Sequence, residues 1–352
     1  MLLIHPPLSK PSEPPAGIAR LAGAVDKLSL SIVDANPDAI LRTIHGPITD
    51  DDTWTRRSKK NLLSNLNYLR QSNTWEIDKY IRAVMDINRL LERSFYKKGV
   101  KASLGNYQDR NLSPLRSGDL IHAAEAPEEN PFYPYFKDWV VPQEDRIAGI
   151  SLNFLSQAIH VFSIIGYIKK HHPGIRVILG GGLVTSWMKR PEWKNPFSGL
   201  VDEMVAGPGE AHIRQMLGLK ESLSHVRPRY DIFPVRDYLS PGFVLPYSTS
   251  SGCYWQKCRF CPEKAEGNPY LPLSPDRVMD DLLALIDIHD PSMIHILDNA
   301  ISPSVLKRFI KTPLNRPWYG FVRITDHFKD PDFCIGLKKS GCVILSRDQF
   351  PY

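Results

Sequence analysis

Apolar and amphipathic segments alternate near both ends of the chain, which predicts the strands and helices of an α/β protein. An apolar run at residues 2–4 precedes a segment at 16–27 with apolar positions on one helical face, and a second apolar run follows at 30–33. A strand, a loop, a helix and another strand in this order usually begin a parallel sheet. The pattern therefore predicts an N-terminal parallel sheet with helices packed against it.

The alternation stops between about residues 40 and 146. The clearest element of this block is a helix predicted at 75–96, where five apolar residues recur at helical spacing: Ile77, Ile81, Val84, Leu91 and Phe95. We interpret 40–146 as a helical insertion that packs on the sheet of an N-terminal domain comprising residues 1–216.

Strands and helices alternate again after the insertion, with strands predicted at 147–154, 176–179 and 203–205. Two glycine-rich turns follow the second and third of these strands: Gly180-Gly181-Gly182 and Gly207-Pro208-Gly209-Glu210. Glycines at the carboxyl ends of parallel strands let a ligand approach the backbone closely, although they serve equally well as simple tight turns. The GxGxxG dinucleotide fingerprint is absent after the first strand.

Residues 217–242 are rich in proline and lack a clear period, so we predict a linker there and a second domain at 243–352. In that domain, strands are predicted at 244–249, 293–297 and 318–324, and a fourth begins at residue 342. The helices between them are predicted to start at a capping Ser or Asp that precedes a proline: Ser274, Ser302 and Asp330. Such successive units form a parallel sheet, either open or curling into a barrel.

No helix is predicted after the strand that begins at Cys342. Parallel strands are normally covered by helices on both faces. We therefore expect the parallel sheet of the second domain, whether open or curling into a barrel, to be cut off in mid-fold.

The composition is that of a water-soluble protein, with 42% hydrophobic and 23% charged residues in 352. The chain begins without the basic flank and long apolar core of a signal peptide, and no apolar run approaches the roughly 20 residues that cross a bilayer. The net charge of +6 is modest and is not interleaved with aromatic residues as in nucleic-acid binders. We expect a cytoplasmic protein with reduced thiols and with neither nucleic acid nor membrane as a partner.

The stretch GCYWQKCRFCPE, residues 252–263, holds three of the five cysteines: Cys253, Cys258 and Cys261. Clustered cysteines in a reducing compartment bind metals more often than they form disulfides. Zinc is one alternative, with a fourth ligand from His295, His327 or Cys334, but zinc loops usually bring their ligands as two pairs. Three thiolates without a fourth are better suited to an iron–sulfur cube with one open iron, since cluster irons normally take cysteine thiolates.

The cysteine loop, with an aromatic residue just before its last cysteine, resembles the cluster loop of radical S-adenosylmethionine (SAM) enzymes. The wider phrase LPYSTSSGCYWQKCRFCPE resembles members of that family that carry an N-terminal cobalamin-binding domain, as do the opening IHPPLSKPSEPPAGIARLAGAV, GISLNFLSQA, ILGGG and VAGPGE. The resemblance covers nearly the whole chain except the insertion. It implies a doubly wound parallel sheet of the cobalamin-binding type followed by a partial radical SAM barrel.

The resemblance also implies cofactors and site residues in the second domain. The three loop cysteines would hold a [4Fe–4S] cluster, whose open iron would bind SAM for reductive cleavage to a 5′-deoxyadenosyl radical. Phe260 would pack beside the adenine, Asp298 and Asn299 would meet the SAM amino group, and Arg323 would face its carboxylate or ribose. The spacing departs from the usual family loop, because four residues rather than three separate Cys253 from Cys258.

In the first domain the resemblance implies a cobalamin-like site formed by seven residues: Ser151, Asn153, Gly181, Gly182, Gly207, Gly209 and Glu210. The Asp-x-His-x-x-Gly signature, which supplies a lower axial histidine to cobalamin, is absent. The proline at position 208 stands where an acidic residue is commoner in the family.

Two interpretations of function follow from the resemblance. In the first, the chain is a radical SAM enzyme, with cobalamin-dependent methyl transfer or a rearrangement as its reaction and a flavodoxin or ferredoxin as its reductant. In the second, it is an inert truncated fragment of such an enzyme, or a half-barrel that a companion chain completes. The substrate is not readable from the sequence, because loops and insertions determine it in such folds.

Overall fold

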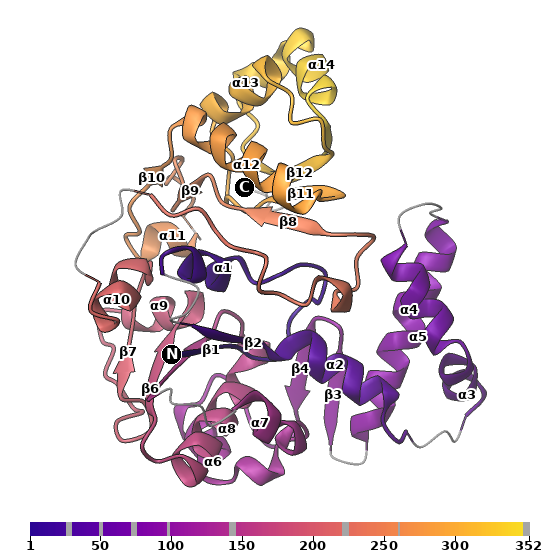
Figure 1. Cartoon of the computed structure of the whole chain (residues 1–352), viewed down its shortest axis with the longest axis vertical. Helices are drawn as coiled ribbons and strands as arrows, with labels where there is room; N and C mark the ends of the chain where they lie inside the picture. Colours follow the sequence, from indigo (N-terminus) through magenta and orange to yellow (C-terminus); the bar gives the residue numbers. More distant parts are fainter. Residues whose placement is uncertain are drawn as a thin grey trace. The chain divides into compact units, whose positions relative to one another are not determined.

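The computed structural model describes residues 1–25, 30–48, 52–71, 76–96, 99–140, 146–219, 225–259 and 261–347 (Figure 1). The chain divides into two compact units, Met1–Ser240 and Pro241–Tyr352. Each unit is built on its own parallel sheet with helices, so the prediction of an α/β protein with parallel sheets is confirmed.

The sheet of the first unit has five parallel strands in the order β2-β1-β5-β6-β7. The strands are β1 (Leu2–His5), β2 (Ser31–Asp34), β5 (Ile147–Ser151), β6 (Arg176–Gly180) and β7 (Glu203–Met204). The order reverses at β1, because β2 lies on one side of it and the later strands lie on the other. Open parallel sheets bind ligands beyond the carboxyl ends of the strands at such a reversal.

Helices and short 3-10 turns lie between these strands or follow the last of them. They are α1 (Ala16–Gly23), α2 (Ala35–His45), α6 (Ser117–Glu125), η3 (Pro127–Glu129), α7 (Tyr133–Trp139), α8 (Leu155–His171), α9 (Gly182–Met188), α10 (Glu210–Met216) and η4 (Val235–Asp237). Every residue of α8 from 157 to 166 is buried, because α6 and α7 pack on it (Figure 1). Gly166 allows the closest approach, since a Cβ there would lie 1.9 Å from the carbonyl oxygen of Ala124.

The insertion contributes the helices α3 (Thr53–Lys60), α4 (Leu62–Arg70) and α5 (Ile77–Phe95), which stand together in Figure 1. It also contains an antiparallel hairpin of β3 (Val100–Ser103) and β4 (Asn106–Asp109), which the sequence analysis did not predict. The long predicted helix is confirmed as α5, but not every residue that the apolar spacing placed on its inward face is buried. Ile77 and Ile81 are 66% and 48% exposed, whereas Ile87 and Leu90 are fully buried.

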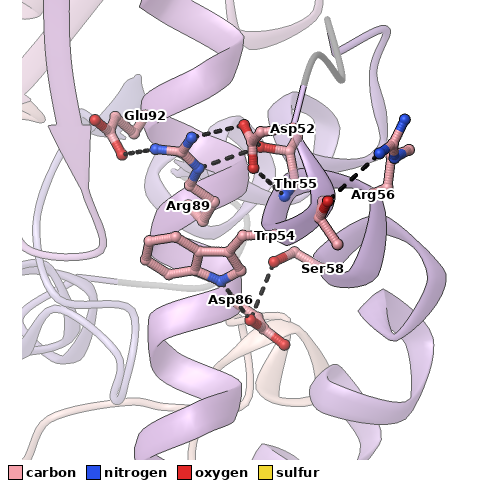
Figure 2. A network of polar contacts seen from close by, with 9 residues as sticks. Asp52, Trp54, Thr55, Arg56, Ser58, Asp86, Arg89 and Glu92 are labelled. Carbon is pink, nitrogen blue, oxygen red and sulfur yellow. Dashed lines mark hydrogen bonds and ion pairs between the residues drawn. The ribbon is translucent and has the colours of Figure 1, made fainter.

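A buried carboxylate, Asp86 of α5, ties the three insertion helices together. Its Oδ1 accepts hydrogen bonds from Trp54 Nε1 (2.8 Å) and Ser58 Oγ (3.0 Å) of α3, as Figure 2 shows, and from Arg57 Nη2 (3.2 Å). Its Oδ2 accepts from Asn65 Nδ2 of α4 at 3.2 Å. Burial alone would raise the pKa of Asp86, but these hydrogen bonds outweigh it and hold the pKa below its ordinary value.

The segment expected to be a linker, residues 217–242, packs within the first unit over most of its described part. Tyr230 is fully buried there, and Tyr238 donates a hydrogen bond to Asp34 Oδ2 at 2.5 Å. Arg70 of α4 donates to the carbonyl oxygens of Asp237 and Tyr238. Residues 220–224 of the expected linker lie outside the described residues.

The second unit has a four-stranded parallel sheet in the order β13-β12-β11-β8. Its elements are β8 (Val244–Tyr247), β9 (Ser250–Ser251), α11 (Pro262–Ala265), β10 (Leu271–Pro272), α12 (Pro275–His289), β11 (Met293–Ile296), α13 (Pro303–Lys311), β12 (Trp318–Val322), η5 (Asp326–Lys329), α14 (Pro331–Lys339) and β13 (Cys342–Arg347). Successive parallel strands are neighbours, so each helix connects two adjacent strands.

The three predicted helix starts in this unit are confirmed. Ser274, Ser302 and Asp330 are the N-caps of α12, α13 and α14, and each side chain accepts a backbone N–H of the first turn. Proline follows each cap, where its missing N–H costs nothing and its fixed φ suits the helix. These local signals place the strands between the helices, and so fix which residues reach the carboxyl edge of the sheet.

Candidate functional site

The cysteine loop leaves the carboxyl end of β8 and is closed at its base. Its two ends pair as the antiparallel strands β9 and β10, with Ser251 opposite Leu271. Gly252 has φ +74°, and a Cβ there would lie 2.4 Å from the carbonyl oxygen of Pro269, so this close approach requires glycine. Across the loop, Gln256 Nε2 donates to the carbonyl oxygen of Asn268 at 3.1 Å. The two ends of the loop are therefore held together.

All three loop cysteines are free and partly buried. Cys261 is the N-cap of α11. In the described part of the chain, no three or more His, Cys, Asp or Glu side chains lie together in a way that would hold a metal ion. Neither the three thiols nor the zinc alternative with His295, His327 or Cys334 is therefore preassembled among these residues.

The donor chemistry nevertheless fits an iron–sulfur cluster, since three thiols come from one loop with a closed base. Two further cysteines lie outside the loop. Cys334 is exposed, and burial raises the pKa of Cys342 to about 11, so that this thiol stays protonated at neutral pH.

Asp298 lies just past β11 and holds the beginning of the cysteine loop. Its Oδ1 accepts the backbone N–H of Thr249 at 2.6 Å, and its Oδ2 accepts the hydroxyls of Thr249 and Ser250. The side chain is buried, and burial raises the pKa of Asp298 above its ordinary value because these hydrogen bonds offset the desolvation only in part. Asp298 is thus occupied by the polypeptide to which the cysteines belong.

Asn299 is exposed beside it and reaches the far end of the cysteine loop. Its Nδ2 donates to Glu263 Oε1 of α11 at 2.9 Å, two residues after Cys261. Asp298 and Asn299 therefore contact opposite ends of the loop. Phe260, predicted to pack beside adenine, lies outside the described residues.

Arg323 follows β12 and contacts the middle of the loop. Its Nη1 lies 3.9 Å from Cys258 Sγ, and its Cζ lies 4.6 Å from the centroid of the Trp255 ring. The structure thus brings Cys258, Asp298, Asn299 and Arg323 to the carboxyl end of one sheet. Sequence reasoning missed Trp255 and Glu263, although both lie within the quoted cysteine stretch.

In the first unit, four residues predicted for the cobalamin-like site meet at the ends of β5 and β6. Asn153 Nδ2 donates to Ser151 Oγ at 3.0 Å, and Asn153 Oδ1 accepts the backbone N–H of Gly182 at 2.9 Å. Gly181 has φ +113°, and a Cβ there would lie 2.3 Å from the carbonyl oxygen of Leu152. The glycine turn is thereby fixed against the end of β5.

The other three predicted residues lie past β7. The backbone N–H of Gly207 donates to Thr185 Oγ1 of α9 at 2.9 Å, and a Cβ at Gly207 would meet no atom within 4 Å. Glu210 forms an ion pair with Arg20 of α1 at 2.6 Å, and a Cβ at the neighbouring Gly209 would lie 3.2 Å from Leu21. Gly207 thus borders open space, whereas Gly209 and Glu210 pack against α1.

Two cavities lie in the insertion, and no residue predicted for a site lines either of them. One, of about 340 Å³, is lined by residues of α5 and the β3–β4 hairpin together with Trp54. The other, of about 310 Å³, lies among α3, α4 and α5 and includes Arg57, Lys79, Arg82 and Asp86. No sequence motif marked either cavity, because the walls of each come from separate elements of the insertion.

Comparisons with known proteins identify no relative of this chain. No protein-family model, no curated protein and no solved structure matches the chain. Among the described helices, none combines the length and the apolar character that a membrane crossing needs.

Proposed function

We propose that the second unit binds a [4Fe–4S] cluster through Cys253, Cys258 and Cys261 and acts on SAM as a radical SAM protein. The observation that carries this proposal is the convergence on the cysteine loop: three thiols lie on it, and the ends of β11 and β12 contact it through Asp298, Asn299 and Arg323. Active sites of βα arrays lie at this carboxyl edge. When bound, the cluster would supply one electron for cleavage of the SAM sulfonium.

Different residues of the chain would position the cysteine loop and hold SAM. Asp298 is 4% exposed and already accepts three hydrogen bonds, so we assign it to positioning the loop. Asn299 is exposed at the same strand end, so we assign it to the SAM amino group. Arg323 lies near Cys258, and its predicted contact with the SAM carboxylate or ribose stays a prediction.

We also propose a cobalamin-like ligand for the first unit, at the carboxyl edge formed by Asn153, Gly181, Gly182 and Gly207. The support is the fixed glycine turn and the open space at Gly207, which together leave backbone accessible to a ligand. Cobalamin, when bound, would supply a carrier for a methyl group. This part of the proposal is independent of the cysteine loop.

The decisive experiment is anaerobic reconstitution of the purified chain with iron and sulfide. We expect about four iron atoms per chain, and formation of 5′-deoxyadenosine after addition of dithionite and SAM. Cys258→Ala should lose most of the iron and all of the SAM cleavage, because one of three thiolate ligands is gone.

Cys334→Ala is the matched control, since it removes an exposed thiol outside the loop and should leave both readouts unchanged. Cluster assembly without SAM cleavage would refute the enzymatic part of the proposal. Equal iron content in wild type and Cys258→Ala would refute the cluster itself. In a separate sample, retention of the visible absorbance of hydroxocobalamin after desalting tests the first unit.

A further inference from the structure

Arg323 is held between an aromatic ring and a thiol. Its guanidinium carbon lies 4.6 Å from the centroid of Trp255, within the range of a cation–π interaction, and its Nη1 lies 3.9 Å from Cys258 Sγ. The guanidinium is planar and permanently charged, so a ring can hold it in one orientation while its N–H groups point elsewhere. Trp255 therefore fixes the direction from which the cation approaches the sulfur.

A second cation on the same ring provides a comparison within the loop. Lys257 Nζ lies 4.9 Å from the centroid of Trp255, close to the distance of Arg323. Among the hydrogen bonds of the described residues, the one to Cys258 Sγ comes from Arg323. The two side chains thus carry the same charge near the same indole, and differ in whether they contact the ligand sulfur.

We infer that Arg323, oriented by Trp255, is a positioning residue for Cys258 that raises the reduction potential of a cluster bound by the loop; this rests on the proposed function. Reduction adds one electron and hence one negative charge to a cluster and its thiolates. A cation and a hydrogen bond at a ligand sulfur favour the more negative, reduced state. The contact would therefore make the cluster easier to reduce.

The test is a potentiometric titration of the reconstituted protein, followed by the electron paramagnetic resonance signal of the reduced cluster. We expect Arg323→Ala to lower the ratio of reduced to oxidised cluster about tenfold at a fixed potential, equivalent to about 59 mV for one electron. Arg323→Lys keeps the charge without the planar fork and should fall between wild type and Arg323→Ala. Trp255→Leu should shift the potential in the same direction, because Arg323 is then no longer oriented.

Lys257→Ala is the matched control, and we expect a clearly smaller shift from it than from Arg323→Ala. Equal shifts in these two variants would overturn the inference, since the effect would then be general charge rather than contact with Cys258. An unchanged potential and signal in both Arg323→Ala and Arg323→Lys would also overturn it, and iron content shows that each variant carries the cluster. A wild-type chain that takes up no cluster refutes the proposed function itself, which is a different result.

Discussion

Asp86 in the insertion and Asp298 beside the cysteine loop are both buried carboxylates, 3% and 4% exposed, yet their pKa values move in opposite directions. Asp86 accepts four hydrogen bonds, one of them from the cationic Arg57. Asp298 accepts hydrogen bonds from the amide and hydroxyl groups of Thr249 and Ser250. Burial disfavours the charge at both sites, and only at Asp86 do the donors outweigh it.

The difference indicates two uses of a buried carboxylate. Asp86 joins three helices of the insertion through Trp54 and Ser58 of α3, drawn in Figure 2, and through Asn65 of α4. These hydrogen bonds favour its charged form, which suits a purely structural role. At Asp298, at the edge of the proposed active site, burial raises the pKa and makes the charged form less favourable. Shifted pKa values of this kind are frequent at functional sites, although structural networks of ion pairs also produce them.

Asp86→Ala is expected to have the larger effect on stability. It leaves the buried Ser58 hydroxyl, the Trp54 indole N–H and the Asn65 amide without their acceptor, and we expect a loss of about 2–4 kcal/mol. Hydrogen exchange resolved by peptide should show faster exchange in α3, α4 and α5. Unchanged exchange in these helices would mean that Asp86 does not hold them together.

Asp298→Ala should destabilise by about 1–3 kcal/mol, because the Thr249 N–H loses its acceptor in a buried position. Faster exchange should be confined to β8 and the start of the cysteine loop. Asp298→Asn is the matched control, since the amide oxygen still accepts that N–H and the buried charge is gone. A loss in Asp298→Asn as large as that in Asp298→Ala would contradict our view that the charge itself is unfavourable there.

The dependence of stability on pH should have opposite signs at the two sites. The folded pKa of Asp86 is lowered from 3.8, so its stabilisation is complete above that value and is lost as the pH falls below it. The folded pKa of Asp298 is raised from 3.8, so the folded state gains stability as the pH falls through that raised value. Urea unfolding of wild type, Asp86→Asn and Asp298→Asn between about pH 3 and 7 measures the pH dependence of the free energy of unfolding at both sites. If the free energy of unfolding of the two variants changed with pH in parallel, the predicted opposite signs would be wrong.

Much of the fold was predictable from the sequence because the signals are local. Ser274, Ser302 and Asp330 each cap a helix by bonding a backbone N–H a few residues away, which is readable without knowledge of the rest of the chain. The three loop cysteines are likewise a local pattern within nine residues. The β3–β4 hairpin was missed because its strands, VKAS and NYQD, lack an apolar run like the one that marked β1.

The sequence by itself determined where the strands of the two parallel sheets lie and which residue types gather in the cysteine loop. Tertiary structure alone decided which face of α5 is buried, since packing against α3 and α4 turns Asp86 inward and leaves Ile77 exposed. It also decided that Arg323 meets Cys258, 65 residues away along the chain. Such contacts depend on how parallel strands align at their carboxyl ends, and this alignment arises only when distant segments pair into one sheet.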